Sequence, residues 1–114
     1  MFFAMVFTSC TGGGSSPSGL TEKVYNAVIK KDWNTAINYF NLDEKEKPFF
    51  LALLKRTYER NPIVKCEIVS EQITEDGKKA EVTVKNYYKD GTDQTTSNCC
   101  VKTDSGWKME VNCR

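Results

Sequence analysis

The spacing of apolar residues changes once along this chain, and that change limits the folds open to it. In the first half, Leu20 and Val24 begin a series at intervals of three and four, which is the period of an α-helix. In the second half, Ala80, Val82 and Val84 alternate with polar residues, as in a strand with one buried face. Helices followed by neighbouring strands predict one α+β domain with its helices packed on one face of an antiparallel sheet.

Capping residues mark where the helices begin. Ser16 and Pro17 suit the start of the first helix, and Asp32 suits the start of a short second one. Pro48 places the beginning of a third near Lys47, and Asn61-Pro62 ends it.

The remaining residues predict four strands joined by tight turns. Residues 63–74 are rich in β-branched side chains, and Asp76-Gly77 and Asp90-Gly91 are hairpin signals. A strand over residues 92–103 follows, and we expect a three-residue loop, Asp104 to Gly106, that pairs Thr103 with Trp107.

The N-terminal segment indicates export. Residues 1–7 read MFFAMVF, and Thr8-Ser9-Cys10 then precede a Gly/Ser-rich stretch. Small residues before a cysteine resemble the lipobox of bacterial lipoproteins, which implies a lipidated Cys10. The apolar run is short and lacks Lys or Arg, so we expect a truncated signal. The expected organisation is a signal segment over 1–10, a flexible linker over 11–19 and a domain over 20–114, held to the bilayer on the extracytoplasmic side of the bacterial envelope.

Charge and residue types argue against several activities. Sixteen Lys and Arg balance fifteen Asp and Glu, so we expect no nucleic-acid partner. The chain has no histidine, and we expect no catalytic residue, no metal and no cofactor. Asp32 is the one acid flanked by aromatic residues that could line a pocket, but Lys-Asp-Trp at a helix start is ordinary capping chemistry.

Five cysteines in a short exported chain favour disulfides. With Cys10 acylated, four are left. The expected register brings Cys113 near Cys99, and a slip of one residue would give Cys100 instead. Pairing of Cys66 with the remaining cysteine is the weaker prediction, and a free, buried Cys66 is the alternative.

The order of several short motifs resembles a known group. The motifs are Val24 to Val28, Lys31-Asp32-Trp33, residues 75–82, Tyr88 to Gly91 and Gly106-Trp107-Lys108. Together they are similar to lumazine-binding-like lipoprotein domains of unknown function, within the nuclear transport factor 2-like (cystatin-like) superfamily. The resemblance implies a curved four-stranded sheet around helices, with a hollow between them, and pairing of two copies through their sheets in some members.

Whether four aromatic residues line a pocket or fill the core bears on which function such a fold has. Tyr25, Trp33, Phe50 and Tyr58 could line a pocket in the hollow, or they could simply fill the core. We therefore carry three hypotheses: a non-catalytic envelope lipoprotein that binds a protein or envelope partner through its sheet, a small-molecule binder that uses the hollow, and an isomerase or hydrolase built on Asp32. An open pocket with converging polar groups would favour the second.

Overall fold

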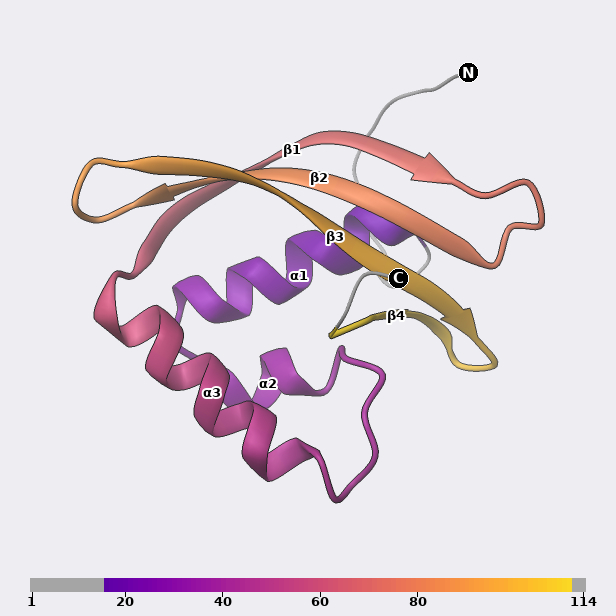
Figure 1. Cartoon of the computed structure of the whole chain (residues 1–114), viewed down its shortest axis with the longest axis horizontal. Helices are drawn as coiled ribbons and strands as arrows, with labels where there is room; N and C mark the ends of the chain where they lie inside the picture. The colour runs from indigo at the N-terminus through magenta and orange to yellow at the C-terminus, as the bar shows by residue number, and fades with distance from the viewer. Residues whose placement is uncertain (1–15, 112–114) are drawn as a thin grey trace.

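The computed structural model describes residues 16–111, which form three helices and one sheet. The helices are α1 (Pro17–Ile29), α2 (Trp33–Ile37) and α3 (Lys47–Arg60). The strands are β1 (Ile63–Ile73), β2 (Lys79–Tyr88), β3 (Asp93–Thr103) and β4 (Gly106–Met109). The sheet is antiparallel with strand order β1-β2-β3-β4, and all three helices lie on its concave side (Figure 1). The predicted α+β fold is confirmed.

The first helix begins as its sequence predicts. The Ser16 side chain accepts a hydrogen bond from the Gly19 N–H at 3.0 Å, and Pro17 occupies the first turn. Residues 17–19, which we expected in the linker, therefore belong to α1. The buried side of the helix includes Leu20 and Val24, and it packs against Val82 and Val84 in the core.

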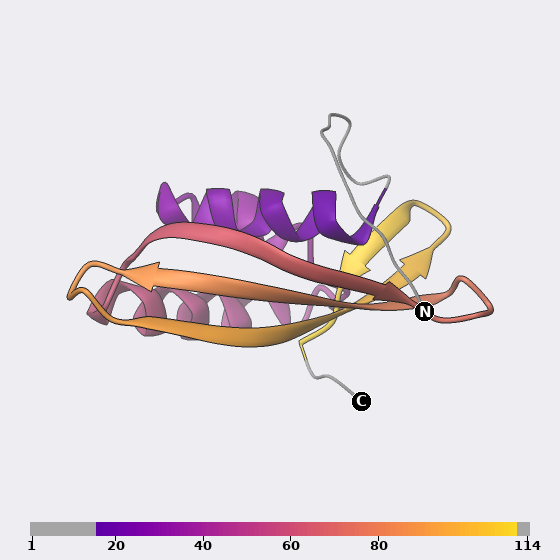
Figure 2. The ribbon, with the colours of Figure 1, turned by 90° about the horizontal axis from the view of Figure 1, so that it is seen from above.

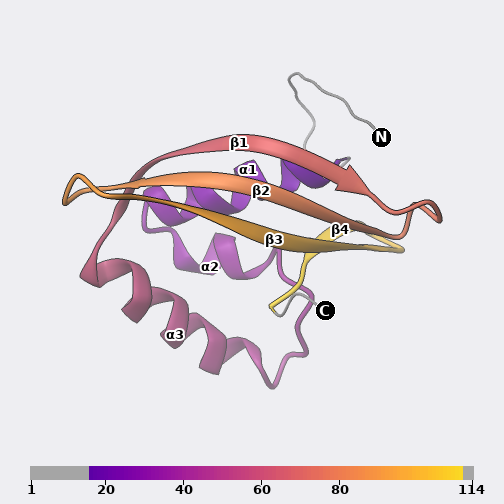
Figure 3. The ribbon, with the colours of Figure 1, turned by 45° about the horizontal axis from the view of Figure 1, so that its top comes forward.

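Tight turns join the strands into a meander. Gly77 and Gly91 have φ angles of +72° and +94°, which side chains other than glycine rarely adopt. They lie in the two hairpin turns that the sequence predicted. Figures 2 and 3 show β1, β2 and β3 running side by side as long strands, with β4 as a short hairpin arm near the start of α1.

The register between β3 and β4 differs from the prediction by one residue. Thr103 pairs with Gly106, and Lys102 pairs with Trp107. The turn is therefore the two residues Asp104 and Ser105, and Gly106 belongs to the strand with a φ of +114°. The Thr103 hydroxyl donates to the Gly106 carbonyl at 2.7 Å, which holds this tighter turn.

The far side of β4 is covered by the chain that follows α2. Phe40 and Met109 form a parallel bridge, and the Asn41 N–H donates to the Met109 carbonyl at 2.8 Å. The Met109 N–H in turn donates to the Tyr39 carbonyl at 2.8 Å. This pairing closes one end of the space between the helices and the sheet.

Candidate functional site

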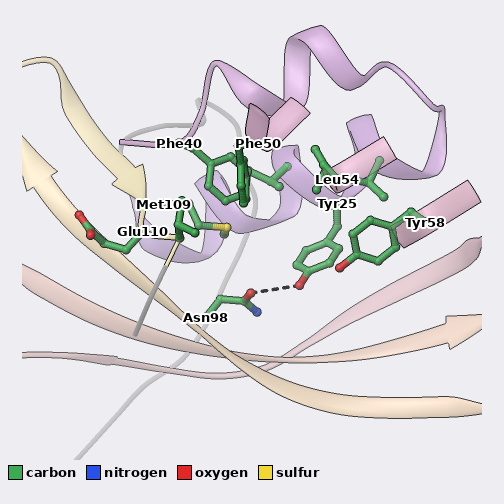
Figure 4. Close-up of a pocket in the computed structure, with 11 residues that line it drawn as sticks. Tyr25, Phe40, Phe50, Leu54, Tyr58, Asn98, Met109 and Glu110 are labelled. Atoms are coloured by element: carbon green, nitrogen blue, oxygen red, sulfur yellow. Dashed lines mark hydrogen bonds between the residues drawn. The ribbon is translucent and has the colours of Figure 1, made fainter. Parts of the chain in front are cut away.

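The hollow between helices and sheet is filled at its centre and open at one side. Leu20, Val82 and Val84 are each at most 1% exposed and fill the centre. Beside them lies a cavity of about 180 Å³ (Figure 4). Its walls come from α1, α3, β3 and the segment around β4; they are Val24, Tyr25, Val28, Phe40, Phe50, Leu54, Tyr58, Asn98, Met109, Glu110 and Val111.

Three of the four predicted pocket residues line this cavity. Tyr25 comes from α1, and Phe50 and Tyr58 come from α3. Trp33, the fourth, is buried in the hydrophobic core and is not among the lining residues. The Phe50 ring packs edge-on against Phe40 with centroids 4.9 Å apart, so this part of the wall is held by aromatic packing.

Asn98 is the polar group at the base of the cavity. Its Oδ1 accepts a hydrogen bond from the Tyr25 hydroxyl at 3.0 Å, drawn in Figure 4. Its Nδ2 is buried and has no hydrogen-bond partner among the described residues. A buried amide donor without a partner is costly, so this nitrogen is suited to a ligand acceptor.

Tyr58 supplies a second hydroxyl on the same side. Burial raises the pKa of Tyr58 above its ordinary value, and the neighbouring Tyr25 and Tyr88 raise it further. The phenol therefore stays neutral and keeps its proton at physiological pH. Figure 4 shows its oxygen beside that of Tyr25, above the Asn98 amide.

Two more inward-facing groups on the sheet lack partners. The Oγ1 of Thr96 and the Oδ1 of Asn86 are buried and make no hydrogen bond within residues 16–111. Thr96 pairs with Val84 across β2 and β3, so its side chain lies on the inner face, two residues from Asn98. The inner face of the sheet is thus unusually polar beside the cavity.

Asp32 lies away from the cavity, at the surface. Its carboxylate accepts from the Thr35 hydroxyl at 2.8 Å and from the Thr35 N–H at 3.4 Å, and the side chain caps α2. The isomerase or hydrolase hypothesis requires this carboxylate inside a pocket, and the structure does not place it there.

The cysteines divide between the two faces of the sheet. Cys66 and Cys100 are free thiols, which contradicts a disulfide at either of them. Both lie on the inner face, and burial raises the pKa of Cys66 to about 11. Cys99 pairs with Glu81 on the outer face, and its carbonyl accepts from the Glu110 N–H at 2.8 Å. Cys10 and Cys113 lie outside the described residues.

The outer face of the sheet is polar. The amines of Lys65 and Lys85 lie 5.2 and 5.3 Å from the centre of the Tyr87 ring, and the Tyr87 hydroxyl donates to Glu67 at 2.8 Å. Tyr88, on the inner face, donates to Gln94 at 3.3 Å. Neither of the adjacent tyrosines is the freely exposed ring that would mark an apolar partner surface.

Comparison with solved structures identifies the fold. The chain superposes on a protein named as an NTF2-like transpeptidase from Campylobacter jejuni with a TM-score of 0.65 and 17% identity, covering 86% of this chain and 100% of that one. The chain has the nuclear transport factor 2-like fold. It is also similar to a calcium/calmodulin-dependent protein kinase type II association domain from Thiobacillus denitrificans, with a TM-score of 0.66 and 11% identity over 87% of this chain and 93% of that one.

A third similar structure is larger. A SEC-C motif containing protein from Psychrobacter arcticus gives a TM-score of 0.70 at 13% identity, covering 89% of this chain and 62% of that one. No family model matches the chain, and no curated protein matches it. At these identities the likeness concerns the nuclear transport factor 2-like fold alone. No helix among residues 16–111 is long and apolar enough to cross a membrane.

Proposed function

We propose that this domain binds a small, mainly apolar molecule carrying one hydrogen-bond acceptor, in the cavity under its sheet. The observation that carries the proposal is that the Asn98 side chain lines the cavity while its buried Nδ2 has no hydrogen-bond partner among the described residues. A ligand carbonyl or hydroxyl oxygen would accept from this nitrogen, and the neutral Tyr58 phenol could supply a second donor.

The size and walls of the cavity define the ligand further. Apolar cavities of about 150 Å³ hold benzene, so a cavity of about 180 Å³ fits one six-membered ring with a short substituent. Phe40, Phe50 and Leu54 would contact the ring. The Glu110 carboxylate, which accepts from the Asn41 side chain at 3.0 Å, lies at the edge of the cavity and disfavours an anionic ligand.

A matched pair of probes tests the proposal. Acetophenone and ethylbenzene have nearly the same shape, but only acetophenone has a carbonyl. We expect acetophenone to shift the Asn98 side-chain amide signals in a ¹H–¹⁵N spectrum and to bind several-fold more tightly, as one hydrogen bond of about 1 kcal/mol requires. Asn98→Leu should remove this preference while retaining weak binding of both probes. Asn38→Leu, an exposed position, is the control. Unchanged Asn98 signals at saturating probe would refute the site.

The partner-binding hypothesis has less support. Val64 and Val69 are exposed on β1, but the ordered contacts around Tyr87 make the neighbouring outer face charged. For this reason we propose the hollow, and not the outer face of the sheet, as the binding surface.

We further propose that the domain is held to the bacterial envelope through Cys10 and is a lumazine-binding-like lipoprotein domain. The lipobox-like Thr8-Ser9-Cys10 and the motif order described above support this, and the shared fold is compatible with it. A palmitate analogue should label the wild-type protein when it is expressed in bacteria with its full signal, and Cys10→Ala should abolish the label. An unlabelled wild-type protein would refute the anchor.

A further inference from the structure

The outward face of α3 combines exposed apolar side chains with unpaired arginines. Phe49 is 74% exposed and Leu53 is 43% exposed, and they are one helical turn apart. Arg56 and Arg60 continue the same face at intervals of three or four residues, and both are exposed. Within residues 16–111 neither arginine has a carboxylate within ion-pair distance.

The charge of the helix is strongly one-sided. α3 contains Lys47, Lys55, Arg56 and Arg60 against Glu59 alone, which is four positive charges against one negative charge, a net +3. An acid of the preceding turn neutralises Lys47, which leaves Lys55, Arg56 and Arg60 against Glu59, a net +2. Glu44 pairs with Lys47 at 3.1 Å, and Glu46 accepts from the Asp43 N–H at 3.1 Å. The face is therefore positive beside its apolar residues.

We propose that this face of α3 docks on the surface of an anionic lipid bilayer. Phe49 and Leu53 would insert at the level of the headgroups and upper acyl chains. The long side chains of Arg56 and Arg60 would reach back to the phosphates. Aromatic and aliphatic side chains flanked by Arg and Lys on one side of a helix are the pattern by which helices lie in the membrane interface.

The size of the apolar area favours a membrane over a protein partner. A whole Phe side chain offers roughly 200 Å², whereas a stable protein interface covers about 800 Å² on each partner. Two exposed apolar side chains are too few for such an interface. They are sufficient for shallow insertion, because the arginines add electrostatic attraction to anionic lipid.

The opposite side of the same helix forms a wall of the cavity. Phe50, Leu54 and Tyr58 line the cavity, and Leu54 is 7% exposed. Docking would thus leave the inward contacts of α3 in place, and it uses only side chains that the fold leaves unburied. The docking proposal does not depend on ligand binding or on lipidation of Cys10.

Tryptophan placed at the docking position tests the proposal. The full chain with Cys10→Ala avoids a lipid anchor, and Phe49→Trp in this background adds a reporter on α3. The native Trp33 and Trp107 are 9% and 7% exposed, so they give a constant background. With mixed phosphatidylcholine–phosphatidylglycerol vesicles we expect a blue shift and quenching by brominated acyl chains. Vesicles of phosphatidylcholine alone should give much less of both.

The control is the same change at another exposed apolar position. Val69 is 57% exposed on β1, and Val69→Trp should show neither effect. This comparison also separates docking by α3 from any binding by the apolar residues 1–7, which both variants share. Equal quenching at both positions, or quenching at neither, would overturn the proposal. A concentration-dependent blue shift of Phe49→Trp without vesicles would also overturn it, since it would indicate a protein interface.

Charge variants provide a second measurement. Arg56→Gln in the Phe49→Trp background should weaken vesicle binding about fivefold, the factor that corresponds to about 1 kcal/mol for one basic residue near an anionic surface. Lys85→Gln, on the outer face of the sheet, should leave binding unchanged. Equal weakening by both changes would contradict a docking surface confined to α3.

Discussion

Thr96→Val should stabilise the domain, which is unusual for a substitution on the inner face of a sheet. The Thr96 Oγ1 is buried without a hydrogen-bond partner among the described residues. Valine has almost the same shape and also suits a strand, so the change removes the polar atom without creating a cavity. The stability of the domain should rise because an unsatisfied group no longer has to be kept from water.

The expected size follows from the burial of that hydroxyl. An unsatisfied buried donor or acceptor costs about 1–3 kcal/mol. Because the Thr96 residue as a whole is only partly buried, we expect the lower part of this range, about 1–2 kcal/mol. For a domain of this length, each kcal/mol raises the melting temperature by roughly 4–8 °C.

Urea denaturation followed by circular dichroism measures the effect. The midpoint should rise while the slope stays the same, since the exposed area of the unfolded chain is unchanged. Thr95→Val is the matched control, because Thr95 is the preceding residue on the same strand and is exposed on the outer face. The control should change stability by less than about 0.5 kcal/mol.

A loss of stability in Thr96→Val would refute the reasoning, since it would mean that the hydroxyl is satisfied in solution. An equal gain in both variants would also refute it, because strand propensity alone would then account for the effect. The expected result would show that the inner face of β3 carries polar groups at a cost to stability.

Three further predictions concern the core, the buried phenol and the cysteines. Leu20→Ala should lower the free energy of unfolding by about 2–5 kcal/mol in urea denaturation, whereas Leu53→Ala, at a 43% exposed position, should cost less than about 1 kcal/mol. Because the pKa of Tyr58 is raised in the folded state, the phenol stays protonated there at pH values where the unfolded chain ionises, so the free energy of unfolding should fall as pH rises above about 10. Tyr58→Phe should reduce this loss at alkaline pH. An identical pH profile for the variant would contradict the raised pKa. Alkylation of the lipidated protein under denaturing, non-reducing conditions should modify Cys66 and Cys100 only, by intact mass, and four modified thiols would disprove the remaining disulfide hypothesis.

The elements of this fold could be read from its sequence because the apolar spacing is regular in each of them. The series that begins at Leu20 and the alternation through Val82 and Val84 each match one period over several turns or residue pairs. The register of β4 could not be read in the same way. Asp104-Ser105-Gly106 suits a loop of two or three residues, and the choice depends on the Thr103 hydroxyl contact with the Gly106 carbonyl.

The candidate site was foreseen on its helical side and missed on its strand side. Tyr25, Phe50 and Tyr58 were predicted as pocket residues because they are aromatic residues at helical spacing. Asn98 on β3 and Glu110 just after β4 were not predicted, because polar residues on strands and at strand ends are ordinarily solvated. One signal was available in the sequence: Asn98 and Cys100 are two residues apart on a predicted strand, so they share a face of the sheet. The structure shows that this is the inner face, where Cys100 is 1% exposed.

A bulge in β1 could not be predicted from the sequence either. The pairing with β2 shifts between Ile68 and Ser70, so Glu71 pairs with the buried Val82. Its carboxylate then accepts from the Ser18 N–H at 2.9 Å, at the start of α1. No glycine or proline marks this position in the sequence. The side chains that point inward are simply shifted by one residue after the bulge.

The third helix owes its place to few inward side chains. Leu54 is the one buried residue of α3, whereas α1 buries seven along a similar length. Amide protons of α3 should therefore exchange with solvent by local opening, at a lower free energy than those of α1 and without unfolding of the sheet. Because Phe50, Leu54 and Tyr58 are a wall of the cavity, each opening of this kind is also an opening of the cavity. Detachment of α3 would then give a bound molecule a second, wider route in and out, beside the open side of the cavity.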